Sequence, residues 1–127
     1  MTVIVKDNGF GIKNIIINEP KTYNSLSFKT LNILINIFRR LENDNKTRVI
    51  ILSGNGKGFS AGHNLKEVKN LKVRSKYLKL FNLCSKLMLN IVEGRKPVIA
   101  KVHGSAFAAG CQLAASCDLA YASTDAK

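Results

Sequence analysis

The sequence predicts a layered α/β fold with parallel strand pairing, and three observations favour this class. Short β-branched or continuous apolar runs, typical of strands, recur along the chain. The segments between several of them carry apolar residues at helical spacing. The resulting order is ββαβααβαβ, and strands that alternate with helices are typical of layered folds whose strands pair in parallel.

The first half of the chain is predicted to begin with a hairpin. Thr2–Lys6 and Ile12–Ile17 are β-branched runs on either side of a segment that contains Asn8-Gly9. Ser27 is a plausible N-cap for a helix that should end near residues 43–45. The apolar residues of that helix recur every three or four positions: Phe28, Leu31, Leu34, Ile35 and Phe38. Arg48–Ser53 is a continuous apolar run, which predicts a strand buried on both faces.

The second half is predicted to alternate glycine-bearing loops with helices and strands. The expected elements are a loop at Gly54–Gly62, helices at Asn64–Val68 and Val73–Ile91, a buried strand at Val98–Val102, a loop at His103–Ala109, a helix at Gly110–Ser116 and a strand at Leu119–Ala122. Since the last strand lies close to Lys127, we interpret the end as a cut. We expect apolar surface to be exposed over residues 98–122.

Composition indicates one globular domain with a modest core. Of the 127 residues, 46% are hydrophobic and 22% charged, which is not the composition of a disordered chain. No apolar run approaches the roughly 20 residues that span a bilayer, so we predict no membrane span. The first ten residues show neither a signal peptide nor a transit peptide.

The net charge of +12 suggests anionic partners: nucleic acid, an acidic membrane or a small phosphorylated ligand. The basic residues are spread along the chain, which favours a generally basic surface over a dedicated nucleic-acid stripe. Cys84, Cys111 and Cys117 form no CxxC pair and are predicted to be reduced and buried, as in a reducing compartment. Neither His63 nor His103 lies at ligand spacing from them, so no metal site is predicted.

Two loops are the candidate functional segments. Gly54–Gly62 and Gly104–Gly110 each follow a predicted buried strand and precede a helix, and neither matches a Walker A or Rossmann pattern. Small residues let backbone approach a ligand closely, and a helix N-terminus leaves amide N–H groups free. If the two strands are close, each loop could direct one N–H at a common oxygen, which is the basis of an oxyanion hole. Alternatively, the small residues only allow tight helix–strand packing.

The motifs in these loops resemble those of the crotonase (enoyl-CoA hydratase/isomerase) family. Lys57–Lys66, KGFSAGHNLK, is similar to the family's Phe-Ser/Ala-Ala-Gly-x-Asp segment, and the stretch from Lys96-Pro97 to Cys117-Asp118 is similar to its second segment. Asn24-Ser25-Leu26 also fits. The resemblance covers nearly all of the chain. It implies a crotonase-like β/α superhelix of repeated ββα units, in which residues 1–127 are the N-terminal part of one acyl-CoA-binding domain whose C-terminal part is missing.

The resemblance also implies roles for particular residues. The backbone amides of His63 and Ala109 match the pair that binds the thioester carbonyl, while the His63 ring is interpreted as packing or solvated. Lys66 could meet a phosphate of coenzyme A or be a solvated helix lysine. The coenzyme A thioester is the implied substrate or ligand, with no separate cofactor. The residues that match the substrate- and CoA-binding positions are Ala61, Gly62, His63, Asn64, Leu65, Lys66 and Gly110.

The residues for acid–base catalysis are not expected in this chain. The first hydratase glutamate is matched by Gln112, whose amide cannot exchange a proton usefully. The second would lie beyond Lys127. We interpret Asp118 as structural and Glu67 and Glu93 as solvated helix charges. The chain is therefore predicted to be inactive as a hydratase.

Three hypotheses about function remain. The first is an acyl-CoA enzyme of crotonase type in fatty-acid and lipid metabolism, enoyl-CoA hydratase-like by resemblance, for whose full-length form a chemistry other than hydration stays open. The second is a non-catalytic acyl-CoA or protein-interaction module. An RNA-binding crotonase relative ranks third, because aromatic and basic residues do not interleave as in RNA-recognition motifs. By resemblance the full-length protein would be a homotrimer in mitochondria, with the cytoplasm as the alternative.

Overall fold

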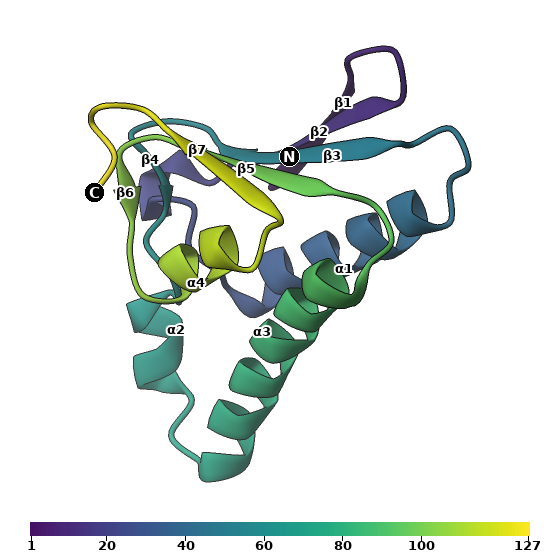
Figure 1. Cartoon of the computed structure of the whole chain (residues 1–127). Coiled ribbons are helices and arrows are strands. Elements are labelled where there is room, and N and C mark those ends of the chain that lie inside the picture. Colours follow the sequence, from purple (N-terminus) through teal and green to yellow (C-terminus); the bar gives the residue numbers. More distant parts are fainter.

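The computed structural model describes residues 1–127, and its elements follow the predicted order (Figure 1). Three short elements are added: a 3₁₀ turn, η1, and strands β4 and β6, which lie in segments predicted to be loops. The elements are β1 (Val3–Asp7), β2 (Ile12–Ile17), η1 (Pro20–Thr22), α1 (Phe28–Glu42), β3 (Val49–Gly54), β4 (Gly58–Ser60), α2 (Leu65–Asn70), α3 (Arg74–Glu93), β5 (Val98–Val102), β6 (Ser105–Ala106), α4 (Ala109–Ala115) and β7 (Leu119–Ala122).

The main sheet has five strands in the order β1-β2-β3-β5-β7. The β1–β2 hairpin is antiparallel, and each later neighbour pairs in parallel: β2 with β3, β3 with β5, and β5 with β7. This confirms the predicted hairpin, the α/β class and the parallel pairing. Since parallel strands point the same way, the loops that follow β3 and β5 leave from one edge of the sheet.

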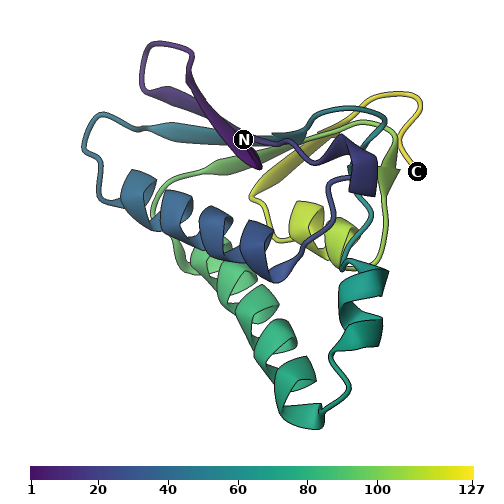
Figure 2. The same cartoon turned by 180° about the vertical axis from the view of Figure 1, so that it is seen from behind.

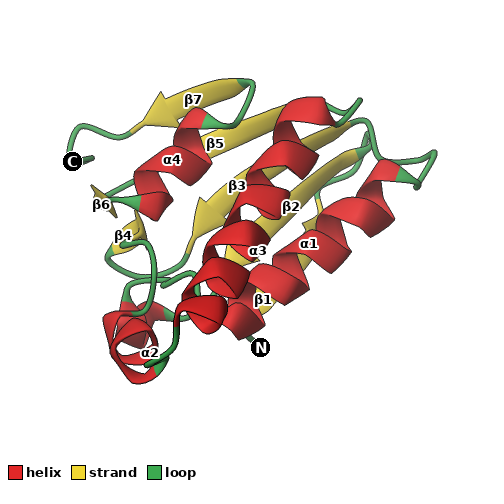
Figure 3. Ribbon diagram, turned by 90° about the horizontal axis from the view of Figure 1, so that it is seen from below, coloured by secondary structure: helices red, strands yellow, loops and turns green.

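The helices cover only one face of this sheet. Figure 3 shows α1, α3 and α4 side by side beneath the strands, and Figure 2 shows the same layer from behind. Ile50 and Leu52 of β3 are buried, whereas Val49 and Ile51 between them are partly exposed. The prediction that the β3 and β5 strands are buried on both faces is therefore wrong, because no helix covers the second face.

Strand β7 is exposed along its whole length although its residues are apolar or aromatic. Leu119 is 56% exposed and Tyr121 67%. This agrees with the expectation of apolar surface near the end of the chain. The neighbouring β5 is better covered, with Val98, Ala100 and Val102 buried.

Helix α1 packs on the sheet through the stripe that its sequence predicted. Leu31, Leu34, Ile35 and Phe38 are all buried. Ser27 caps the helix by accepting a hydrogen bond from the Thr30 amide at 3.1 Å, which confirms the predicted N-cap. None of the helices is long and apolar enough to cross a membrane.

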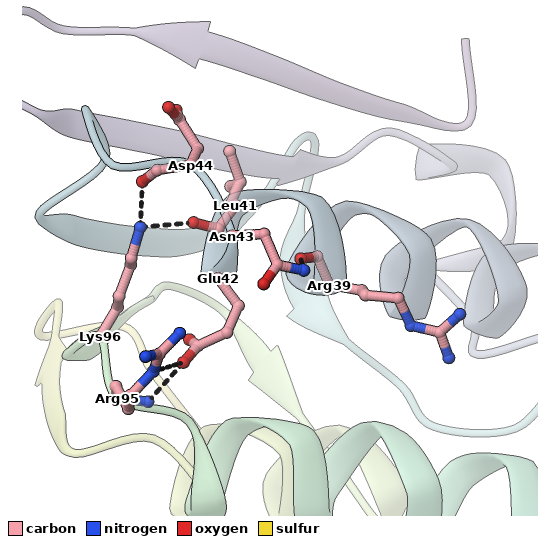
Figure 4. Close-up of polar contacts among 7 residues, drawn as sticks. All are labelled: Arg39, Leu41, Glu42, Asn43, Asp44, Arg95 and Lys96. Carbon is pink, nitrogen blue, oxygen red and sulfur yellow. Dashed lines mark hydrogen bonds and ion pairs between the residues drawn. The ribbon is translucent and has the colours of Figure 1, made fainter.

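The last turn of α1 is fixed by residues that precede β5 (Figure 4). The Lys96 ammonium donates to the Leu41 carbonyl at 2.7 Å and to the Asp44 carbonyl. Arg95 donates its backbone and side-chain N–H groups to Glu42 Oε1, each at 2.9 Å. Burial acts to raise the pKa of Glu42, but the hydrogen bonds and charge of Arg95 outweigh it and hold that pKa below its usual value.

A cavity of about 230 Å³ lies beside this cluster, between the C-terminal ends of α1 and α3. Its wall includes Ile50 and Val98, which stand near the amino ends of their strands. The candidate loops lie at the opposite, carboxyl ends. The cavity is therefore separate from the candidate functional site.

We expect Lys96→Met to lower the free energy of unfolding by about 1–2 kcal/mol, because it leaves the Leu41 carbonyl of α1 and the Asp44 carbonyl just beyond the helix without a charged donor. The apolar stem is retained, so packing changes little. Urea unfolding of this variant should be compared with Lys101→Met, a control at an exposed lysine in the same strand region. Equal midpoints for the two variants would contradict the capping role.

Candidate functional site

The two candidate loops meet at the carboxyl edge of the sheet. Strands β3 and β5 are direct neighbours, with Ile50 opposite Val98 and Leu52 opposite Ala100. Beyond them the loops pair again as the small parallel sheet β4–β6, in which Gly58 lies opposite Ser105 and Ser60 opposite Ala106. The expectation that the two strands lie close in one sheet is confirmed, and the loops are held together by backbone pairing.

Glycines allow the two backbones to approach more closely than other residues would. Gly62 has φ +91°, and a Cβ added there would lie 3.1 Å from the Ala109 nitrogen and 3.3 Å from the Ala108 Cβ. A Cβ at Gly110 would lie 2.1 Å from the Ser60 carbonyl oxygen. The start of α4 is therefore in direct contact with the chain around residues 60–62.

The two predicted oxyanion amides lie at this contact. Within the chain, the His63 amide donates no hydrogen bond. Ala109 is the first residue of α4, where no preceding turn supplies an acceptor for its N–H. Ala108 before it has φ 50°, a conformation unusual for a non-glycine residue and one that turns the chain sharply into the helix. Two amides from separate loops thus lie close together and are available to an external oxygen.

A buried network around Asn24 and Ser60 fixes these loops. The fully buried Asn24 side chain donates to the Asn55 and Gly58 carbonyls, both at 2.8 Å, and accepts from the Glu19 amide at 2.9 Å. Ser60 Oγ donates to the Asn24 carbonyl at 2.8 Å and accepts from the Gly62 amide at 3.2 Å. The Ser60 carbonyl accepts from the Phe107 amide of the second loop at 3.0 Å.

Sequence reasoning assigned no positioning role to Asn24 or Ser60. Part of the signal for such a role was present in the sequence, since Asn24-Ser25-Leu26 and Ser60 both lie in the segments that resemble crotonase motifs. What the sequence could not show is that a residue 36 positions earlier bonds to Ser60. Asn24 also has φ 54°, a left-handed conformation that asparagine tolerates better than most residues.

The predicted binding residues between Ala61 and Lys66 differ in their contacts and exposure. The Ala61 amide donates to the Tyr23 carbonyl at 2.9 Å. Asn64 is the N-cap of α2 and accepts from the Lys66 and Glu67 amides at 3.1 and 3.2 Å. Leu65 and the Lys66 side chain are exposed and make no polar contact. Asn64 therefore has a structural role, while Lys66 is free to meet an anion.

The His63 ring is packed against aromatic and backbone groups. Its centroid lies 5.4 Å from that of Phe81 on α3, at an interplanar angle of 60°. Its Nδ1 lies 3.4 Å from the Leu26 carbonyl oxygen. These contacts agree with the interpretation that the ring packs; the role of the backbone amide stays a prediction.

None of the nearby polar side chains is placed as a clear proton donor or acceptor. Gln112 is exposed on α4 and forms no hydrogen bond through its side chain. Asp118 accepts from the Val98 amide at 2.8 Å, a structural contact as interpreted from the sequence. Glu93 is exposed. The interpretation of Glu67 as solvated is wrong, because it accepts from the Phe28 amide at 3.0 Å and so caps α1 from a distance.

The cysteines are unpaired, but the prediction that all three are buried is wrong. Cys84 is buried, and burial raises the pKa of its thiol. Burial, aided by the charge of Asp118, raises the pKa of Cys117 to about 12. Cys111 is exposed, because it lies on the outer side of the short helix α4. No three His, Cys, Asp or Glu side chains are grouped as a metal site would require.

Comparison with known proteins agrees with this geometry. The family model described as enoyl-CoA hydratase/isomerase matches residues 7–127. The chain belongs to this family. It is 45% identical over 113 residues to human enoyl-CoA hydratase domain-containing protein 3, mitochondrial, which covers 89% of the chain and 37% of that protein. It is 36% identical over 126 residues to the mitochondrial enoyl-CoA hydratase of Pongo abelii, covering 96% of the chain and 40% of that protein.

Solved structures of crotonase-family proteins share the fold. An enoyl-CoA hydratase from Mycobacterium smegmatis superposes with a TM-score of 0.97 at 42% identity, and human enoyl-CoA hydratase domain-containing protein 3 with 0.90 at 38%. Each match covers 99% of this chain and 49% of the solved one. The chain thus spans about half of those folded crotonases, which confirms the expected fold and its restriction to the N-terminal portion.

Proposed function

We propose that this chain forms the acyl-CoA-binding part of an enoyl-CoA hydratase-like crotonase of fatty-acid metabolism. The observation that carries the proposal is the contact between Gly62 and the start of α4. It brings the free His63 amide and the free Ala109 amide to the same edge of the sheet. Two N–H groups from separate loops are the arrangement that a thioester carbonyl oxygen requires.

The proposed mechanism is polarisation of the thioester. The carbonyl oxygen accepts from both amides, and these two hydrogen bonds draw electron density onto the oxygen and polarise the C=O bond. The buried Asn24–Ser60 network holds the loops before substrate arrives, so little reorganisation is needed on binding. Exposed Lys66 supplies a positive charge for a phosphate of coenzyme A.

Hydration is not proposed for this chain alone. Gln112 occupies the position of the first hydratase glutamate and offers no titratable proton. A non-catalytic acyl-CoA-binding module is therefore the second candidate, and Gln112 is the observation that favours it. Release of hydrated, isomerised or thioester-cleaved product from crotonyl-CoA, followed by chromatography, would count against that second candidate.

Similarity to family members also supports proposals about the cellular location and the oligomeric state of the protein. The human relative and the Pongo abelii relative both carry the word mitochondrial in their names. On this likeness we propose that the protein is mitochondrial. We also propose that the complete protein assembles as a homotrimer.

Gly62→Ala is expected to weaken acetyl-CoA binding about tenfold, the equivalent of roughly one hydrogen bond, because the new Cβ crowds the Ala109 N–H. Isothermal titration calorimetry measures this. Free coenzyme A has no thioester carbonyl, so its affinity should not change. Gly9→Ala is the matched control, since Gly9 also has positive φ (+77°) but nothing lies within 4 Å of its added Cβ.

Two outcomes distinguish acyl-CoA binding itself from the assignment of the two amides as its carbonyl site. If wild-type chain binds no acyl-CoA, the proposed function fails. If Gly62→Ala retains its circular dichroism spectrum and binds acetyl-CoA as tightly as wild type, acyl-CoA binding survives but the two amides are not its carbonyl site.

A further inference from the structure

Half of the net charge lies in one stretch of the chain. Residues 65–92 contain seven basic residues and one acid, against a net charge of +12 for the whole chain. The acid, Glu67, is turned toward the Phe28 amide. The basic residues are Lys66, Lys69, Lys72, Arg74, Lys76, Lys79 and Lys86. We call residues 65–92, which form α2, the following turn and most of α3, the α2–α3 surface.

The same stretch carries large apolar side chains in contact with solvent. On α3 these are Leu78, Phe81, Leu89 and Val92, whose spacing places them on one side of the helix, away from the core stripe around Leu80 and Leu87. Leu65, at the start of α2, is 81% exposed. Helix α3 thus has one apolar stripe in the core and a second one exposed.

Basic and apolar groups share one side of α3. Leu78, Lys79, Leu83 and Lys86 line the same shallow groove. Figures 1 and 2 show that the turn between α2 and α3 is the part of the molecule farthest from the main sheet. Within these 127 residues, this corner therefore projects into solvent, where a broad, flat partner can reach it.

We propose that the α2–α3 surface docks on anionic phospholipid bilayers. Apolar side chains beside Lys and Arg on one helix are the pattern of interfacial helices, in which the apolar groups enter the headgroup region and the cations meet lipid phosphates. RNA would also meet the cations, but single-stranded RNA is bound largely by stacking on aromatic rings. Of the exposed apolar residues on α3 only Phe81 is aromatic, and its ring packs against His63.

The test is co-sedimentation of the 127-residue chain with vesicles of equal parts phosphatidylcholine and phosphatidylglycerol. Binding is expected to these vesicles and not to pure phosphatidylcholine, and to fall as salt rises. Lys79→Glu/Lys86→Glu should weaken it by at least about 30-fold, since each basic residue near such a surface contributes roughly fivefold. The control Lys6→Glu/Lys46→Glu makes the same charge change at exposed sites in β1 and the α1–β3 loop and should bind nearly as wild type.

A second variant tests the apolar contribution. Leu78→Asn/Leu89→Asn leaves the charge unchanged and should lower vesicle binding about tenfold or more. Circular dichroism checks that each variant is folded. Equal losses for the two lysine pairs, no loss for the leucine pair, or binding to polyuridylate in place of vesicles would each overturn the proposal.

Discussion

Replacing Gly110 by alanine is expected to lower the free energy of unfolding by about 3 kcal/mol or more. In most helices this substitution stabilises by up to about 1 kcal/mol. Here the new Cβ would lie 2.1 Å from the Ser60 carbonyl oxygen and 2.7 Å from its carbon. Both are backbone atoms that cannot rotate away, so α4 must separate from β4 and weaken the bond between the Phe107 amide and Ser60.

Urea unfolding followed by circular dichroism measures this effect, with Gly9→Ala as the control. Gly9 has φ +77° and free space around it, so alanine there should cost only about 1 kcal/mol of backbone strain. A midpoint for Gly110→Ala at or above that of wild type would show that the contact between α4 and Ser60 is not as close as described.

The second large effect is expected for Asn24→Ala, at about 4 kcal/mol. The substitution removes three hydrogen bonds and leaves the Gly58 carbonyl buried without the donor that reached it. Asn24→Asp should be as severe although it keeps the shape, because a carboxylate oxygen would face two carbonyl oxygens. Both variants should lose acetyl-CoA binding in calorimetry, since the loops that carry His63 and Ala109 lose their support.

Asn32→Ala is the matched control for this experiment. Asn32 also donates to a carbonyl, that of Phe28, but it is exposed on α1. Water replaces the lost bond there, so the change should stay within about 0.5 kcal/mol. A similar loss of stability at both asparagines would contradict the argument from burial.

Much of the fold could be predicted because it depends on local patterns. The β1–β2 hairpin, helix α1 with its Ser27 cap, and the strands on either side of α3 are each specified by a periodicity or a turn within a few residues. The neighbouring positions of β3 and β5 followed from the alternation of strands and helices. The two amides were predicted as oxyanion donors through motif resemblance, because physical spacing alone left an ordinary packing role open.

The features that were missed depend on contacts between distant segments. Strands β4 and β6 contain only three and two residues, too few for a periodicity, and they exist because each pairs with the other. The capping of Phe28 by Glu67 spans 39 positions. The half-exposed state of β3 and β5 depends on which face the helices cover, and a run of apolar residues cannot indicate that.

The contacts of Ser60 determine how strongly movements of other elements change the distance between the His63 and Ala109 amides. One residue contacts the Gly62 amide through its hydroxyl and the Phe107 amide through its carbonyl, and it meets Gly110 directly. A short series of covalent bonds and hydrogen bonds, which passes through Ser60, therefore connects the His63 nitrogen to the Ala109 nitrogen. A slight bend of the sheet, or a small shift of α3 against α1, changes the spacing of the two donors little, because neither element is part of that series.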